Sequence, residues 1–146
     1  MDVSIIYVNY RTSRLVIDSI NSVKEKTQGI LYEIIIVDNN SGDGSLAKIQ
    51  EIHPDVITIQ SEKNVGFGQA NNLGLKKADG KYIFFLNPDT LLRNNAIGEL
   101  FRFLELNMNV GACGGNLYDE EGNATTSFSR KYPSFLWELL GICLLY

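Results

Sequence analysis

The sequence lacks a basic segment, and this absence limits the partners that it can bind. Its 146 residues carry 13 Lys and Arg against 17 Asp and Glu, a formal net charge of -4, with no long run of either cation. Binding to duplex nucleic acid requires a basic face that neutralises phosphates. We therefore expect no nucleic-acid partner, and an anionic ligand would need a metal ion, a helix N-terminus or a few well-placed cations.

Cysteine is scarce as well. The two cysteines, Cys113 and Cys143, lack the spacing of a metal site and stand among apolar residues. We expect both to be inert buried thiols, because that is the usual state of an isolated cysteine in an apolar setting. A reducing cytoplasm suits such a chain.

The two ends of the sequence differ in character. The N-terminus opens directly into an apolar run at residues 3–8, with no charged region before it, so we expect no signal peptide. Residues 135–146 are strongly apolar but shorter than the roughly 20 residues of a membrane-spanning helix. We expect residues 1–134 to form one globular domain. Residues 135–146 would begin a missing region of a truncated chain.

Apolar runs rich in Val and Ile recur along the chain, at residues 3–8, 33–37, 56–59 and 82–86. Nearly continuous runs of this kind are typical of strands buried on both faces of a parallel sheet. Apolar residues at helical spacing follow each run: Leu15, Ile17, Ile20 and Val23; Leu46, Ile49 and Ile52; Phe67, Ala70, Leu73 and Gly74; Ile97, Leu100, Phe101 and Leu104. The alternation predicts an α/β domain whose doubly wound, mostly parallel sheet carries helices on both faces.

The pattern changes after Met108. Residues 110–115 predict one further strand, and the residues from 116 on predict a C-terminal β-hairpin. Its turn would lie at residues 119–123 and its edge strand at residues 124–128.

Polar residues follow each expected strand, at the edge where ligands of open parallel sheets bind. The clusters occupy residues 9–11, 38–44, 62–66 and 87–90. Each alone could be a helix cap, a turn or a strand exit. The opposite edge carries only short connectors, so the asymmetry favours a ligand site. His53 belongs to one of those connectors, and we expect it to be a surface residue without a catalytic role.

Two clusters suggest how a phosphate could be held. Residues 66–72 are no dinucleotide fingerprint, since they follow the third strand and place Asn71 where Gly or Ala is required. They do begin a helix with little side-chain bulk, whose free N–H groups can face an anion. Asp89 follows Asn87-Pro88 at a strand tip, and Mg²⁺ or Mn²⁺ accepts one or two carboxylates plus phosphate oxygens and water. Asp89 therefore predicts a divalent metal site.

Four ordered motifs together resemble glycosyltransferase family 2, and most of all its rhamnosyltransferase-like bacterial members. They are VNY at residues 8–10, IVDNNS at 36–41, NVGFGQANNLG at 64–74 and FLNPDT at 85–90. The likeness covers roughly residues 3–135. It implies a GT-A fold and a donor site for a nucleoside-diphosphate sugar.

The resemblance also implies roles for individual residues. The nucleotide-sugar-binding residues would be Asn9, Tyr10, Asp38, Asn40, Asn64, Gly66, Asn72 and Asn87. Asn9 and Tyr10 would lie near the base and ribose, and Asp38 on one of the two. Asp89 would be the metal ligand of the family's Asp-X-Asp signature, with Asn87 in place of the first acid.

The implied activity is that of an inverting glycosyltransferase of bacterial surface-polysaccharide synthesis, in the cytoplasm or at the inner face of the membrane. It would move a sugar to a glycan or lipid-linked acceptor. The family's general base is an acid in a later segment, and the turn at residues 119–123 better explains Asp119, Glu120 and Glu121. We expect the base beyond residue 146. Residues 135–146 would pack on the missing part, on a second copy or on a membrane surface.

Two other functions remain open. A catalytically silent nucleotide-sugar-binding or scaffold domain of a polysaccharide-assembly complex would also lack the base. A nucleotidyltransferase would carry a Gly-rich, basic phosphate loop after its first strand, and residues 9–13 do not form one.

Overall fold

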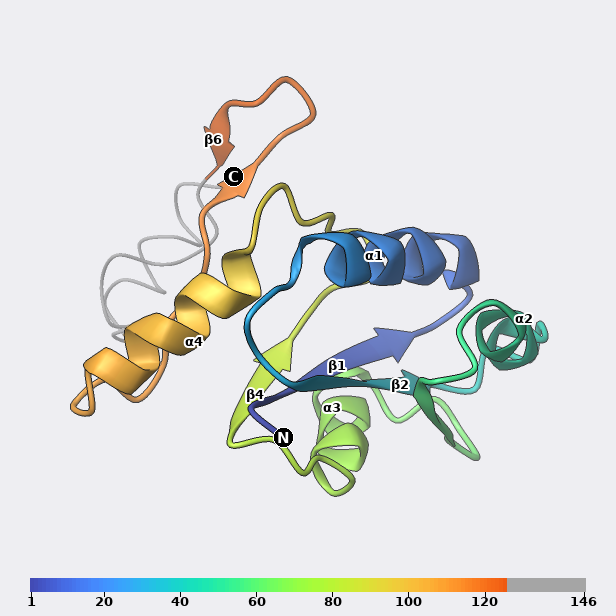
Figure 1. Cartoon of the computed structure of the whole chain (residues 1–146). Coiled ribbons are helices and arrows are strands. Elements are labelled where there is room, and N and C mark those ends of the chain that lie inside the picture. The colour runs from blue at the N-terminus through green and yellow to red at the C-terminus, as the bar shows by residue number, and fades with distance from the viewer. Residues whose placement is uncertain (126–146) are drawn as a thin grey trace, which may run out of the picture. The chain divides into compact units, whose positions relative to one another are not determined.

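The computed structural model describes residues 1–125, and the chain divides into two compact units, residues 1–113 and residues 114–146. The first unit alternates strands and helices along the chain (Figure 1): β1 (Val3–Asn9), α1 (Ser13–Lys26), β2 (Tyr32–Asp38), α2 (Ser45–Ile52), β3 (Ile57–Gln60), α3 (Phe67–Leu75), β4 (Tyr82–Phe85) and α4 (Ala96–Leu106). The strands form one parallel sheet in the order β3-β2-β1-β4. This confirms the predicted α/β fold.

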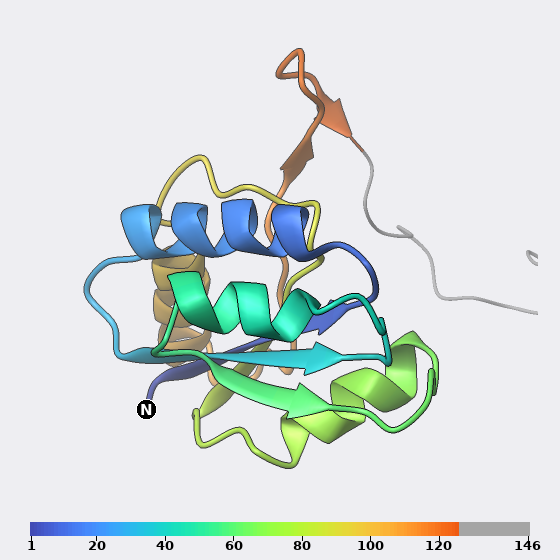
Figure 2. The same cartoon turned by 90° about the vertical axis from the view of Figure 1, so that its right-hand side faces the viewer.

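Helices cover both faces of the sheet, as predicted. Helices α1 and α2 lie on one face and α3 on the other (Figure 2). Alternate residues of the strands point into two cores, so that Ile5 and Ile36 pack with α1, α2 and α4, while Val8 and Val37 pack with α3. Helix α3 approaches the sheet closely, because a Cβ at Gly74 would lie 2.6 Å from Ile6 Cγ2.

The second unit contains the predicted hairpin. Strands β5 (Leu117–Tyr118) and β6 (Ala124–Thr125) pair in antiparallel fashion. The turn between them is closed by hydrogen bonds from Asp119 N to Asn123 O at 3.0 Å and from Asn123 N to Asp119 Oδ1 at 2.8 Å. Residues 126–128 of the predicted edge strand, the segment 135–146 and Cys143 lie outside the described residues.

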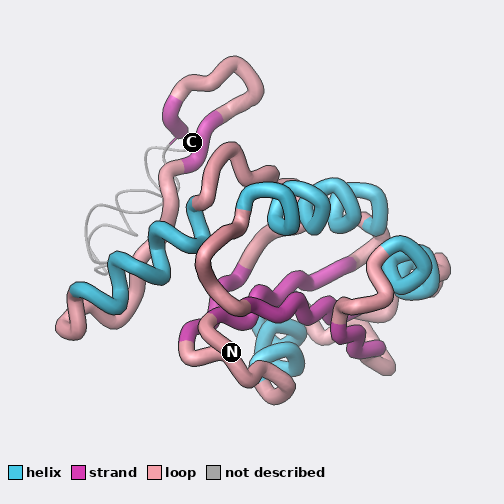
Figure 3. Tube along the Cα trace, viewed as in Figure 1, coloured by secondary structure: helices cyan, strands magenta, loops and turns pink. Residues whose placement is uncertain are grey.

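The strand predicted at residues 110–115 is wrong. The chain between α4 and β5 is a loop (Figure 3). Three of these residues are glycines, which weaken strands, and the described part of the chain pairs no strand with them.

None of the helices within residues 1–125 has both the length and the hydropathy of a membrane-spanning segment.

The burial predicted for Cys113 is also wrong. Cys113 is a free, exposed cysteine, because the loop that carries it lies outside the sheet. Its Sγ lies 3.9 Å from the Leu100 carbonyl oxygen of α4. This partial desolvation raises the pKa of the Cys113 thiol, which disfavours the reactive thiolate.

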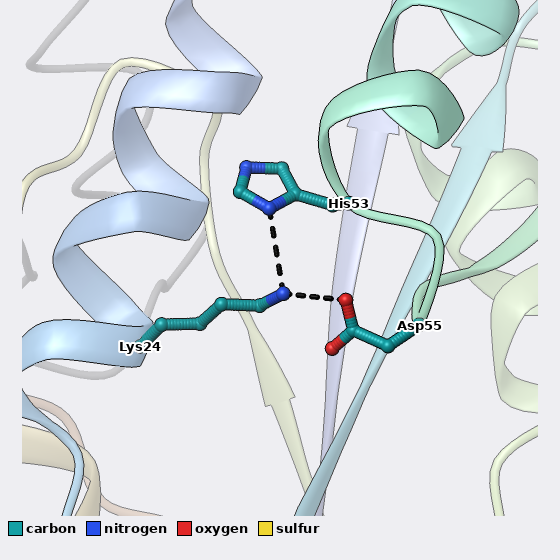
Figure 4. Close-up of polar contacts among 3 residues, drawn as sticks. All are labelled: Lys24, His53 and Asp55. Atoms are coloured by element: carbon teal, nitrogen blue, oxygen red, sulfur yellow. Dashed lines mark hydrogen bonds and ion pairs between the residues drawn. The ribbon is translucent and has the colours of Figure 1, made fainter.

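His53 is buried rather than on the surface, so that prediction is wrong too. Its side chain is 5% exposed, because the end of α2 packs against α1. Lys24 of α1 lies between two acceptors, with its Nζ 3.4 Å from His53 Nδ1 and 2.5 Å from Asp55 Oδ1 (Figure 4). Burial lowers the pKa of His53 and the Lys24 ammonium lowers it further, against a weaker opposing effect of Asp55. The imidazole is therefore neutral in the folded chain at pH 7.

Lowering the pH from 7.0 to 5.5 is expected to destabilise the fold through His53. Because the pKa of His53 is lowered on folding, the unfolded chain binds the proton first and the free energy of unfolding falls as the pH drops below about 6.5. His53 is the single histidine, so no other side chain ordinarily titrates in this range. Urea unfolding at several pH values measures the slope, which His53→Gln should flatten. Equal slopes in both proteins would contradict the prediction.

Candidate functional site

The site centres on Asp38, the last residue of β2. Its side chain is 2% exposed and its carboxylate accepts hydrogen bonds from Asn9 Nδ2 at 2.6 Å, Gln60 Nε2 at 2.9 Å and the Ser41 amide at 3.0 Å. The Ser41 hydroxyl donates a further bond. Burial alone would raise the pKa of Asp38, but the donors from Ser41, Gln60 and Asn9 outweigh it and hold that pKa below its ordinary value. Asp38 is thus a fixed negative charge at neutral pH.

Asn9 joins three elements at this edge. It stands opposite Asp38 in the β1–β2 pairing, and its Nδ2 also donates to Ser41 Oγ at 3.2 Å. Its Oδ1 accepts from the Thr12 amide at 3.2 Å and from the Thr12 hydroxyl at 3.1 Å, at the start of α1. The two strand ends and the first turn of α1 are therefore held as one assembly.

The backbone at this edge is strained. Within residues 1–125, the non-glycine residues with positive φ are Arg11 at 59° and Asn40 at 63°, one in each of the loops that follow β1 and β2. The Arg11 amide donates to Ser41 Oγ at 2.9 Å, which joins these loops. The Arg11 guanidinium lies 5.4 Å from the ring centroid of the exposed Tyr10. Strained residues of this kind concentrate at ligand sites.

A second asparagine pair positions the start of α3. The buried Asn39 donates from Nδ2 to Asn64 Oδ1 at 2.9 Å and accepts from the Val65 amide at 2.9 Å. Asn64 Oδ1 also accepts from the Gly66 amide at 3.0 Å. Gly66, with φ of 81°, precedes α3 and supplies no side-chain cap. The N-terminus of α3 is thus held beside the end of β2, with its first amides open to a ligand.

A pocket of about 480 Å³ opens next to Asp38, between the loop after β2 and the end of β3. It is lined by Asp38, Asn40, Gly42, Gly44, Ser45, Leu46, Ala47, Gln60, Ser61 and Glu62. Ser41 belongs to a predicted polar cluster but had no predicted binding role. Gln60 was not singled out from the sequence, although a polar residue that closes an apolar strand was a usable signal. Asn40, one of the predicted binding residues, also lines the pocket.

Asn87 and Asp89 lie just past β4, which pairs with β1, and the bond from Leu86 N to Ile6 O at 3.0 Å extends that pairing. Both side chains are exposed, and within residues 1–125 no hydrogen bond or ion pair engages the Asp89 carboxylate. No group of three His, Cys, Asp or Glu that could hold a metal occurs in the described part of the chain. A metal here would need ligand phosphate oxygens and water besides Asp89, which suits Mg²⁺ or Mn²⁺.

The structure brings most of the predicted site residues to one edge of the sheet. Hydrogen bonds join Asn9 to Asp38 and, through Asn39, connect the end of β2 to Asn64 and Gly66. Asn72 is exposed on α3, and no hydrogen bond among the described residues joins its side chain to the others. The buried neighbour Asn71 instead donates to the Phe67 carbonyl at 3.1 Å, one turn earlier in α3.

The profile of Glycosyl transferase family 2 matches residues 4–143. An uncharacterized glycosyltransferase of Nostoc sp. is 32% identical over 114 residues, covering 76% of this chain and 35% of that protein. The putative teichuronic acid biosynthesis glycosyltransferase TuaG of Bacillus subtilis is 27% identical over 140 residues, covering 93% of this chain and 55% of that protein. The chain therefore spans between a third and about half of the length of these relatives.

Solved structures share the fold. TarS of S. aureus in complex with UDP aligns with a TM-score of 0.66 at 21% identity, covering 74% of this chain and 33% of that one. The mannosyltransferase PcManGT of Pyrobaculum calidifontis, in complex with GDP-Man and Mn²⁺, aligns with a TM-score of 0.63 at 22% identity, covering 70% and 32%. The fold is of the GT-A type, as the resemblance in the sequence implies.

Proposed function

The chain belongs to glycosyl transferase family 2, and from this membership we propose that it binds the nucleoside-diphosphate sugar donor of an inverting glycosyltransferase. The complete enzyme would transfer the sugar to a glycan or lipid-linked acceptor in bacterial cell-surface polysaccharide synthesis. Relatives named for teichoic and teichuronic acid biosynthesis support that setting. The cytoplasm, or the inner face of the membrane, is where such donors would be met.

The observation that supports donor binding most is the contrast between the two carboxylates that follow β2 and β4, the strands on either side of β1. Asp38 is buried and saturated by donors beside a pocket, whereas Asp89 is exposed with no partner among the described residues. A saturated carboxylate shapes a rigid wall, which suits the nucleoside. A free carboxylate suits a cation that neutralises a diphosphate. Asn87 and the open N-terminus of α3 would flank the phosphates.

In the proposed reaction this chain holds the donor, and a base outside it activates the acceptor. The base removes the acceptor hydroxyl proton, the oxygen attacks the anomeric carbon, and the nucleoside diphosphate leaves with inversion. A bound Mn²⁺ or Mg²⁺ would act as a Lewis acid on the diphosphate. Asp119 accepts hydrogen bonds that close its hairpin turn, which supports a structural role for this carboxylate rather than that of the base.

A nucleotide-sugar-binding or scaffold domain without catalysis is the second candidate. It is favoured by the same saturation of Asp38, which leaves that carboxylate poorly suited to take a proton from an acceptor. A contact of residues 135–146 with a membrane or a second copy would fit either function.

Calorimetric titration of the chain with UDP, dTDP and GDP, each with and without Mn²⁺, tests donor binding. Tighter binding of one nucleotide in Mn²⁺ would support the donor site and identify the nucleotide. Binding of none of the three under either condition would contradict it. A full-length protein that binds the donor but transfers no sugar to any surface-glycan acceptor would favour the second candidate.

A further inference from the structure

We propose that Ser19 of α1, with Ser22 one turn later, is a positioning residue that fixes the loop carrying Asp89. The inference rests on the proposed donor site, since it concerns where Asp89 meets a metal and a diphosphate. Both serines lie in α1, which the sequence predicts from the spacing of its apolar residues and not from its serines. Ser19 is 0% exposed, which is a costly place for a hydroxyl unless its hydrogen bonds are made.

The Ser19 hydroxyl is fully engaged on both sides. Its Oγ donates to the Thr90 carbonyl oxygen at 2.6 Å and lies 2.9 Å from the hydroxyl of Tyr7. A serine has one hydroxyl proton, and because that of Ser19 is donated to Thr90, Tyr7 must donate to Ser19. Burial raises the pKa of Tyr7, which keeps the phenol protonated for that bond. The chain of hydrogen bonds is thus directional, from β1 through α1 to the residue that follows Asp89.

Ser22 holds the same loop at a second point. Its Oγ accepts from the Leu92 amide at 3.0 Å and donates to the Ser19 carbonyl at 2.7 Å. The two serines therefore grip the backbone on either side of Leu91, and the buried Leu92 side chain anchors the loop in the core. The loop between β4 and α4 runs alongside α1 in both views (Figures 1 and 2).

This support matters because Asp89 has no anchor of its own. Its side chain is exposed, it belongs to no helix or strand, and within residues 1–125 no hydrogen bond or ion pair holds its carboxylate. Its position is set by the backbone on both sides. The bond from Leu86 N to Ile6 O holds one side, and the turn bond from Thr90 N to Asn87 O at 3.1 Å closes around it. The serine contacts at Thr90 and Leu92 hold the other side. Helix α1 is also bound to Asn9 through Thr12, so one helix connects the Asp38 side of the site with the Asp89 side.

The test compares Ser19→Ala with Ser4→Ala in the whole chain. Ser4 is a matched control, because it is also 0% exposed, accepts from the Gly80 amide at 2.8 Å and donates to Glu33 Oε1 at 2.5 Å, at the opposite end of the sheet. The measured quantity is the ratio of the nucleotide Kd without Mn²⁺ to that with Mn²⁺. Residues that support metal ligands typically contribute 10–100-fold to metal affinity. We expect Ser19→Ala to reduce this ratio by roughly tenfold with unchanged metal-free binding, and Ser4→Ala to leave the ratio intact.

Ser22→Ala, at a half-buried position, serves if Ser19→Ala folds poorly, and a smaller reduction of the ratio is expected for it. If the wild type shows enhancement by Mn²⁺ and a folded serine variant keeps the same Kd ratio as the wild type, this inference is overturned while the proposed function stands. Equal reduction by Ser4→Ala would overturn it as well, since the effect would then be one of general stability. Absence of enhancement in the wild type itself would overturn both this inference and the proposed metal site.

Discussion

Replacement of Asp89 with alanine is expected to abolish the enhancement of nucleotide binding by Mn²⁺ while leaving the free energy of unfolding unchanged. The carboxylate is exposed and engages none of the described residues, so the fold loses no contact with it. The proposed metal would lose its one protein carboxylate. Because even supporting residues are worth 10–100-fold in metal affinity, a loss of about 100-fold or more is expected for the ligand itself. Calorimetry with and without Mn²⁺ measures it.

Asp79→Ala is the matched control for this experiment. Asp79 is likewise an exposed aspartate next to a strand of the sheet, but it precedes β4 and so lies at the opposite edge. Removing it changes the net charge by the same amount without touching the candidate site. If both variants weaken Mn²⁺-dependent binding equally, the effect is one of overall charge and Asp89 is not the ligand.

Asp38→Asn is expected to destabilise the chain by about 3 kcal/mol and to abolish nucleotide binding. The carboxylate oxygens accept hydrogen bonds from Asn9, Gln60 and Ser41. The amide group of an asparagine would replace one of these acceptor oxygens with an NH₂ donor, which would face the existing donors in the buried site. Each buried polar group left unsatisfied costs about 1–3 kcal/mol. Urea unfolding monitored by circular dichroism gives the change in stability, and calorimetry at a temperature where the variant is folded gives the change in binding.

Asp43→Asn is the control for Asp38→Asn, within the same loop. Hydrogen bonds from Ser45 also lower the pKa of Asp43, but its carboxylate faces solvent, and its replacement should cost little. Because the pKa of Asp38 is lowered on folding, its contribution is present above about pH 4 and is lost as the pH falls through that lowered value. Wild-type stability should therefore fall more steeply below about pH 4 than that of Asp38→Asn. Equal urea midpoints for the two variants would refute the role of Asp38.

The strands were predictable because burial on both faces leaves a plain signal. The apolar runs at residues 3–8 and 33–37 correspond to β1 and β2, which end one residue later, at Asn9 and Asp38. From the sequence, polar residues at the end of a strand are expected to belong to the following loop. In this fold Asn9 and Asp38 instead form the last pair of the β1–β2 ladder. The stripe of α1 was less accurate, since Leu15 is 44% exposed and Val16 and Ser19 are buried. A serine that satisfies its hydroxyl inside the core gives no apolar signal.

The position of the site was predictable, and its contacts were not. Parallel strands place their carboxyl ends at one edge, so Asn9, Asp38 and Asp89 could be assigned there from order alone. That Asn9 meets Asp38 depends on how the two strands align. The burial of His53 depends on the packing of α1 against α2. Neither relation is encoded in local periodicity. Residues 110–115 carry apolar side chains between their glycines, but a strand exists only where another offers its edge.

The pairing of Asn9 with Asp38 also bears on how the chain avoids misfolding. The middle of β2 is a run of three isoleucines at residues 34–36, so a slip of this strand by one position would still point an isoleucine to each face of the sheet. Because side chains alternate between faces, that slip would turn the Asp38 carboxylate into the wrong layer, away from the Asn9 amide. An unpaired charge buried there costs several kcal/mol. The hydrogen bond between Asn9 and Asp38 thus favours the correct register of the two strands, and it also shapes the wall of the pocket. A chain that misaligns the strands loses its stability together with its site.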